Sequence, residues 1–291
     1  MLLALALLAV QDAMAKVLGE TLSIWQFHLV RSIFIIGLIG LYAWLRGIGP
    51  GLAVHSPGWA VLRGALMYAA FLLFYLSMTL ASFSLSAAAF FTMPLYITIL
   101  GIVFGGERAS AIRLAALAAG FGGVLLIVQP WAEEPAFELI YALAGAVCYA
   151  LAMSMTRLKL SEDGSAGIYA VQCLVYLQVS IVGIMALDLL APAAQTVEAM
   201  PFLLSGWTVP SGASWWILLA AAATHLVGSL ALIRAYQSGE AGMVGPLEYM
   251  YLPMATLLDI AVWGVTPTVT ALAGMGLIAA AGIAIARAGT G

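Results

Sequence analysis

The stretch GPLEYMYLP, residues 245–253, places a carboxylate, two tyrosines and two prolines inside a segment that is otherwise apolar enough to cross a membrane. Pro246 and Pro253 each lack a backbone hydrogen-bond donor, so a helix through this stretch must bend or break. Irregular backbone inside a membrane is tolerated where protein or a water-filled cavity covers it. The stretch therefore predicts that Glu248 and both prolines lie inside a helical membrane protein.

The composition of the whole chain agrees with this interpretation. Of the 291 residues, 64% are hydrophobic and only 8% are charged, and the mean hydropathy is +1.10. The net charge of −3 gives no reason to expect nucleic acid as a partner. Cys148 and Cys173 both lie in apolar runs, which favours two buried thiols over a disulfide.

The apolar runs predict an all-α membrane protein with ten transmembrane helices. Runs of about 18 residues or more are long enough for a helix to cross the hydrocarbon core. The first run lacks the positively charged flank of a secretory signal, so we expect no cleavable signal peptide. The expected helices are residues 1–18, 23–45, 59–81, 85–104, 111–128, 138–158, 167–189, 213–236, 243–263 and 267–288.

The positions of lysine and arginine predict the orientation of these helices. Cytoplasmic loops carry an excess of both residues. Only Lys16 lies by an odd-numbered loop, and Arg31 lies within the second helix. We therefore expect a multi-pass membrane protein with both termini in the cytoplasm. The residues in or beside even-numbered loops are Arg46, Arg63, Arg108, Arg113, Arg157, Lys159, Arg234 and Arg287.

The chain divides near residue 135 into two sets of five helices, residues 1–134 and 135–291. Because five is odd, the second set must be inverted relative to the first, which is a common transporter architecture. Pro94 and Pro253, 159 residues apart, lie near the middle of the fourth and ninth helices. The sequence thus predicts two inverted five-helix repeats.

Small residues at four-residue spacing predict close packing of the fifth and tenth helices. Such spacing lets two helix backbones approach each other, and we favour packing over a substrate site here. One ladder is Ala115, Ala119 and Gly123, and the other is Gly276, Ala280 and Ala284.

The stretch FYLSMTLASFSLSAAAFFTMPLYITILGIVFGGERAS, residues 74–110, resembles the EamA-type signature of the drug/metabolite transporter superfamily. Its parts are a third helix that ends in small residues, the central Pro94, and the closing pair Gly106 and Glu107. Arg31 is similar to an arginine often found in the second helix of the family. The resemblance covers nearly the whole chain and implies two inverted halves around a central cavity.

This resemblance implies a secondary transporter but does not fix the substrate, because the superfamily carries amino acids, nucleotide sugars, vitamins and drugs. One branch exports amino acids, and some bacterial relatives import metabolites. The resemblance therefore implies amino-acid export, with metabolite import as the alternative. The second half departs from the pattern, since Val265 and Thr266 stand where a second Gly-Glu pair would fall.

Glu248 and Tyr251 share one helix face by their i,i+3 spacing. The repeat offset carries this face onto Thr92 and Tyr96 of the fourth helix, so the two faces predict a pocket for an apolar or aromatic group with a polar head. The alternative is that the tyrosines lie at the membrane interface and the prolines only kink their helices. The predicted pathway residues are Thr92, Pro94, Tyr96, His225, Glu248, Tyr251 and Pro253.

Three charged or titratable residues predict a gate at the outer end. Arg31 shares a helix face with His28, and pairing with Asp12 across the helix gap would close the pathway. The alternatives are that Arg31 extends to the interface and that Asp12 pairs with Lys16 at a solvated surface. A charged group in hydrocarbon costs several kcal/mol unless it is paired or hydrated, so each is a functional candidate.

His225 lies at the centre of the eighth helix, where it either hydrogen-bonds a neighbouring helix or carries a coupled proton. We favour packing for His225 and hydration for Asp259, which lies near an outer helix end. The sequence holds no metal-ligand cluster, nucleophile elbow or phosphate loop, so we expect no enzyme, cofactor or metal. A receptor would more often carry a soluble sensing domain. The expected partners are a small-molecule substrate and the lipid bilayer.

Overall fold

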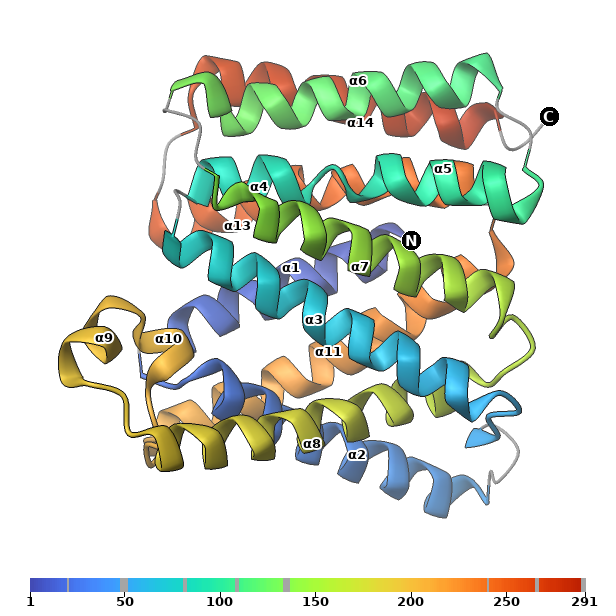
Figure 1. Cartoon of the computed structure of the whole chain (residues 1–291). Helices are drawn as coiled ribbons and strands as arrows, with labels where there is room; N and C mark the ends of the chain where they lie inside the picture. Colours follow the sequence, from blue (N-terminus) through green and yellow to red (C-terminus); the bar gives the residue numbers. More distant parts are fainter. Residues whose placement is uncertain are drawn as a thin grey trace.

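The computed structural model is a bundle of α-helices (Figure 1), which confirms the all-α prediction. The part of the chain that it describes contains no strand. The predicted boundary between residues 134 and 135 lies outside the described residues, as do Arg108, Val265 and Thr266. The described ranges are 1–19, 21–47, 52–80, 83–107, 110–132, 137–239, 241–264 and 267–288.

The helices follow the expected apolar runs. Those of the first half are α1 (Leu2–Leu18), α2 (Ile24–Arg46), α3 (Pro57–Leu80), α4 (Phe83–Phe90), α5 (Met93–Gly105) and α6 (Ala111–Val128). Those of the second half are α7 (Leu139–Leu158), α8 (Ser165–Leu190), α11 (Gly212–Ser238), α12 (Ala241–Leu247), α13 (Tyr251–Trp263) and α14 (Val269–Ala288). Short helices lie between them, namely η2 (Pro130–Ala132), α9 (Ala194–Ala199), α10 (Pro201–Leu204) and η3 (Glu248–Met250).

Among the described residues, seven helices are long and apolar enough to cross a membrane. The count of ten transmembrane helices and the inverted repeats stay predictions. Figure 1 shows the bundle as layers, with α6 and α14 at one side and α2 and α8 at the other. The helices α1, α3, α7 and α11 lie between them, and α3 packs along α7 while α1 packs along α11.

Two helices are broken where the sequence predicted a bend. The fourth expected helix divides at Phe91 and Thr92 into α4 and α5, and the ninth divides at η3 into α12 and α13. Pro94 is the second residue of α5 and Pro253 the third of α13. A proline in a first helical turn sacrifices no bond, because the amide groups there have no helical acceptor. Each break therefore lies just before its proline.

The Gly106–Glu107 pair has a local structural reason. Gly106 ends α5 with φ of 66°, in the left-handed region that glycine adopts without steric cost. The chain can therefore turn sharply, and Glu107 forms an ion pair with Arg157 at 3.2 Å, near the end of α7. The pair ties the end of α5 to a helix of the second half.

The packing of α6 against α14 corrects one of the two small-residue ladders. Gly123 lies in the contact as expected, but Gly276 is exposed, and a Cβ atom there would meet nothing within 4 Å. The partner is Gly274, where a Cβ atom would lie 2.6 Å from the carbonyl oxygen of Gly123. Several faces of α14 carry small residues, so spacing alone did not identify the packed one. Ala280 and Ala284 are also exposed.

Candidate functional site

The Glu248 carboxyl group is the most deeply enclosed acid of the predicted pathway, with 2% of the residue exposed. The Tyr149 hydroxyl of α7 donates to its two oxygens at 3.1 and 3.0 Å. The Tyr236 hydroxyl of α11 donates to Oε1 at 2.5 Å. Three elements of the second half therefore hold one carboxyl group in the interior of the bundle.

The break between α12 and α13 positions Glu248. The residue begins the short η3 turn, and the next residue, Tyr249, packs on Gly120 of α6. A Cβ atom at position 120 would lie 2.4 Å from the Tyr249 ring, so glycine makes room for it. With about three residues per turn, successive residues of a 3₁₀ helix point about 120° apart. Glu248 can thus meet α7 and α11 while Tyr249 meets α6.

Aromatic side chains enclose the Tyr149 ring that binds Glu248. The Phe90 ring of α4 lies 6.0 Å away between centroids, and the Phe71 ring of α3 lies 6.4 Å away, both close to perpendicular. Edge-to-face arrangements of this kind are favourable. The surroundings combine an acid with aromatic surface, which suits a ligand that has both a polar and an apolar part.

Tyr251 takes partners that differ from those of Glu248. Its hydroxyl donates to Oδ2 of Asp12 on α1 at 2.7 Å, and its ring lies 6.0 Å from the Phe91 ring. Asp12 is half-buried. The two residues predicted to share one helix face therefore contact different helices, Glu248 through α7 and α11 and Tyr251 through α1.

The fourth-helix residues of the predicted pathway lie at the other break. The Thr92 hydroxyl donates to the carbonyl of Ala89 at 2.6 Å, so it satisfies the end of α4. Pro94 is buried, and its carbonyl accepts from the Thr98 hydroxyl at 2.9 Å. Tyr96 is half-buried and packs against the main core. The role of these residues in a pathway stays a prediction.

Arg31 is buried, with 4% exposed, so it does not extend to the interface. Its Nη1 donates to Oε1 of Gln11 at 3.3 Å, and its Nη2 lies 2.8 Å from Nδ1 of His28. The guanidinium also lies 4.9 Å from the centroid of the Phe27 ring. In this conformation Asp12 and Arg31 therefore take different partners, because Gln11, one residue earlier, supplies a neutral acceptor.

His225 contacts a neighbouring helix. Its Nδ1 makes a short contact with the Tyr169 hydroxyl of α8 and lies 3.2 Å from the Ser229 hydroxyl one turn along α11. The residue is buried. This geometry is that of a packed histidine, and a role in proton coupling stays a prediction.

Arg63 is a second buried arginine, although the charge pattern predicted that it lies beside a loop. The residue is 2% exposed, its Nε donates to the Thr156 hydroxyl at 2.6 Å, and its Nη1 donates to Gln172. Its position could have indicated burial, because Arg63 is the seventh residue of α3 and so lies inside the helix. The side chains of Arg46, Asp259 and Arg287 lie outside the described part.

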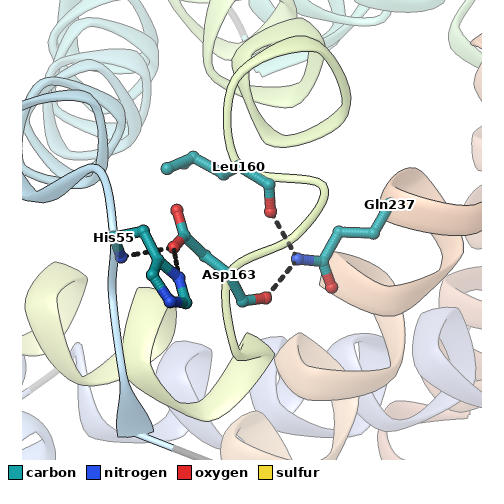
Figure 2. A network of polar contacts seen from close by, with 4 residues as sticks. All are labelled: His55, Leu160, Asp163 and Gln237. Carbon is teal, nitrogen blue, oxygen red and sulfur yellow. Dashed lines mark hydrogen bonds and ion pairs between the residues drawn. The ribbon is translucent and has the colours of Figure 1, made fainter.

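A polar network closes the end of the bundle that the charge pattern assigns to the cytoplasm (Figure 2). The backbone N–H of His55 donates to Oδ1 of Asp163 at 2.5 Å, and the ring Nδ1 lies 3.0 Å from the same oxygen. Nε2 of Gln237 donates to the carbonyls of Leu160 and Asp163 at 2.6 and 2.8 Å. The network joins the α2–α3 loop, the α7–α8 loop and the end of α11.

Contacts also tie the chain together at the opposite end. Nε1 of Trp25 donates to the carbonyl of Leu203 in α10 at 2.7 Å. The backbone N–H of Thr208 donates to Oε1 of Gln26 at 3.0 Å. The segment that carries α9 and α10 therefore packs against the start of α2.

The chain resembles proteins named as transporters. Residues 1–129 match the EamA-like transporter family. The riboflavin transporter of Rhizobium johnstonii is 27% identical over 196 residues, which are 67% of this chain and 59% of that relative. The S-adenosylmethionine uptake transporter of Rickettsia felis is 20% identical over 277 residues, 95% of this chain and 87% of the relative. The pseudopaline exporter CntI of Pseudomonas aeruginosa is 25% identical over 284 residues, 96% of this chain and 92% of the relative.

A crystal structure of another protein superposes on this chain with a TM-score of 0.76 and 18% sequence identity. The superposition covers 97% of this chain and 95% of the other. The apolar helices and the relatives together support a multi-pass membrane transporter with a small-molecule substrate, and they point away from an enzyme. The match over residues 1–129 confirms the resemblance seen around Pro94.

Proposed function

We propose that this protein is a secondary transporter of the bacterial inner membrane that moves a small metabolite by alternating access. The observation that carries the proposal is Glu248, a buried acid that Tyr149 and Tyr236 hold at a broken helix. Ionisable groups at membrane depth are costly and mark substrate or ion pathways. Broken helices at that depth form the binding sites of many transporters.

The packing of the helices supports two inverted repeats. In chain order, α1, α2, α3, α4/α5 and α6 correspond to α7, α8, α11, α12/α13 and α14. Exchanging the halves turns the α1–α11 contact into α7–α3, the α3–α8 contact into α11–α2, and the α5–α7 contact into α13–α1. The contacts α2–α8 and α6–α14 map onto themselves. All of these pairs are present, as a twofold relation between repeats requires.

Contacts between the proposed halves at both ends fit alternating access. The Asp163 network joins the halves at one end, and the Trp25 and Gln26 contacts join them at the other. Each set must open in turn for a substrate to cross. The breaks before Pro94 and Pro253 lie between these ends and give α4/α5 and α12/α13 a place to bend.

The substrate that we propose is an amino acid or a metabolite with an amino-acid head group, moved outward. A buried acid beside aromatic rings suits an ammonium group attached to an apolar part. The pseudopaline exporter among the relatives favours the outward direction. The second candidate is uptake of a cofactor-like metabolite, which the riboflavin and S-adenosylmethionine transporters favour.

Flux into liposomes with the purified protein tests this proposal. The substrate panel is the set of proteinogenic amino acids together with riboflavin and S-adenosylmethionine. We expect protein-dependent flux of at least one compound, saturable and competed by its unlabelled form. Flux that never exceeds that of protein-free liposomes would reject the transporter function for this panel. Flux of riboflavin alone would favour the second candidate.

The orientation gives a separate prediction in intact cells. In a variant without Cys148 and Cys173, a cysteine at Ala53 or Glu162 should be shielded from an impermeant thiol reagent, while one at Gly206 should react. The first two positions lie in even-numbered loops and the third in the segment before α11, and all are exposed. Labelling of Ala53→Cys and Glu162→Cys from outside would reverse the predicted topology.

The prolines at the two breaks are expected to matter for turnover more than for binding. Pro94→Ala and Pro253→Ala each add a backbone donor that can bond four residues back and join the two helical segments. A continuous helix bends less readily, so flux should fall severalfold while substrate affinity changes little.

The matched control is Pro201→Ala, since Pro201 begins the short α10 helix outside the breaks. Flux rates and binding isotherms for the three variants provide the comparison. Normal flux in both Pro94→Ala and Pro253→Ala would show that these prolines only shape their helices.

A further inference from the structure

Among the described residues, two buried donor atoms in and beside Arg31 have no hydrogen-bond partner. They are Nε of Arg31 on α2 and the hydroxyl of Tyr176 on α8. Both residues are almost fully buried, at 4% and 2% exposed. A buried donor without an acceptor costs free energy comparable to a lost hydrogen bond, so a donor left in this state points to an acceptor that is absent.

The two donors belong to one compact cluster. The His28 ring lies 5.1 Å from the Tyr176 ring and 5.3 Å from the Tyr68 ring, and the two tyrosine rings are 4.9 Å apart. His28 also contacts the Arg31 guanidinium through its Nδ1. Trp25 extends the cluster, with its ring 6.2 Å from that of Tyr68. Helices α2, α3 and α8 all contribute to it.

Among its described contacts Arg31 makes no ion pair with a carboxylate, although Asp12 lies within its electrostatic reach. Its side-chain partners are Gln11 and His28, which are both neutral acceptors, while Asp12 is bound by Tyr251. Arg63, the other buried arginine, also donates only to neutral oxygens among its described contacts. Tyr176 lies within electrostatic reach of both guanidinium groups. This part of the interior therefore favours a negative charge.

We propose that Arg31 and Tyr176 form a subsite for the carboxylate of the transported substrate. A carboxylate has two oxygens, so one can accept from Nε of Arg31 and the other from the Tyr176 hydroxyl. The rings of His28, Tyr68 and Trp25 would cover the neighbouring apolar part of the substrate. This inference rests on the proposed transport function and narrows its substrate to molecules with a free carboxylate.

Tyr176→Phe is the sharpest test because it removes only a hydroxyl without a partner. A purely structural role predicts unchanged or improved stability and no change in binding. The proposed subsite predicts that binding of a carboxylate substrate weakens by about tenfold, because a hydrogen bond to a charged group is lost. Tyr249→Phe is the matched control, since that hydroxyl is also buried without a described partner, while the Tyr249 ring packs against Gly120 of α6.

The probes are L-phenylalanine with phenethylamine, and S-adenosylmethionine with its decarboxylated form. We expect wild-type protein to bind at least one carboxylate member more tightly than its counterpart, and Tyr176→Phe to reduce that difference. Arg31→Lys should keep part of the difference and Arg31→Gln should remove it, with folding checked by thermal melting.

Equal affinity of wild-type protein for both members of each pair, or no loss in Tyr176→Phe, would overturn the subsite. So would the failure of every carboxylate probe to bind. Liposome flux of riboflavin, which has no carboxylate, tests the transport function independently of the subsite. Riboflavin flux without carboxylate selectivity would support the transport function and reject the subsite.

Discussion

Glu248→Gln is expected to reduce transport at least tenfold while the protein still folds. Glutamine has nearly the shape of glutamate, and its amide oxygen can still accept from the Tyr236 or Tyr149 hydroxyl. The substitution therefore removes the acid and keeps most of the packing in a site that is 2% exposed. A hydrogen bond to a charged group contributes about 1.5–3 kcal/mol, which corresponds to roughly a tenfold effect or more on a substrate that depends on it.

Glu198→Gln is the matched control, because Glu198 lies exposed in α9, away from the breaks. Initial rates of liposome flux and melting curves in detergent should be recorded for both variants. Unchanged kinetics in Glu248→Gln would show that this acid is a structural group outside the pathway. A large fall in melting temperature with no folded protein would move the test to Tyr149→Phe and Tyr236→Phe, which keep the acid and remove one donor each.

Gly274→Leu is expected to destabilise the fold more than any other change discussed here. A Cβ atom at this position would lie 2.6 Å from the carbonyl oxygen of Gly123 and 2.9 Å from the Ile127 side chain. The first neighbour is backbone, so α6 and α14 would have to separate. Overpacking of this kind costs about 1–3 kcal/mol or more, which corresponds to a fall of roughly 2–12 °C in melting temperature.

The neighbouring face of the same helix supplies the control. Gly276→Leu places the same side chain on α14 where nothing lies within 4 Å of the new Cβ atom. Its melting temperature should stay within about 1 °C of wild type, since exposed substitutions rarely change stability. Equal melting temperatures for the two variants would contradict the observed packing of α6 on α14.

The two broken helices are features that the local sequence predicts. Pro94 and Pro253 removed backbone donors in apolar runs, and the structure has a break before each of them. The place of each break followed from the same chemistry, because a proline is best accommodated in the first turn of a new helix. Glu248 and Tyr251, which were predicted to share a helix face, take their partners from different helices, and their place in a pathway stays a prediction.

Arg31 and Arg63 show why the candidate site was found only in part. Hydropathy marked Arg31 as unusual because it lies inside an apolar run, and the structure shows that it is buried. Arg63 lies near a helix end, where an arginine usually reaches the interface. Only the approach of Thr156 and Gln172 from α7 and α8 turned it into a buried group.

The sequence alone determined that this is a helical membrane protein, where its helices begin and end, and where two of them break. These properties depend on apolar run length and on proline, which act within one segment of chain. The tertiary structure alone decided which partners meet. Tyr149 and Tyr236 contact Glu248 although they lie 99 and 12 residues before it in the sequence. Tyr176 of α8 likewise joins the cluster around Arg31. In an apolar bundle many helix faces are equally hydrophobic, so hydropathy cannot choose between them. Close packing at residues such as Gly120, Gly123 and Gly274 decides which helix faces meet. These contacts exist only in the assembled bundle.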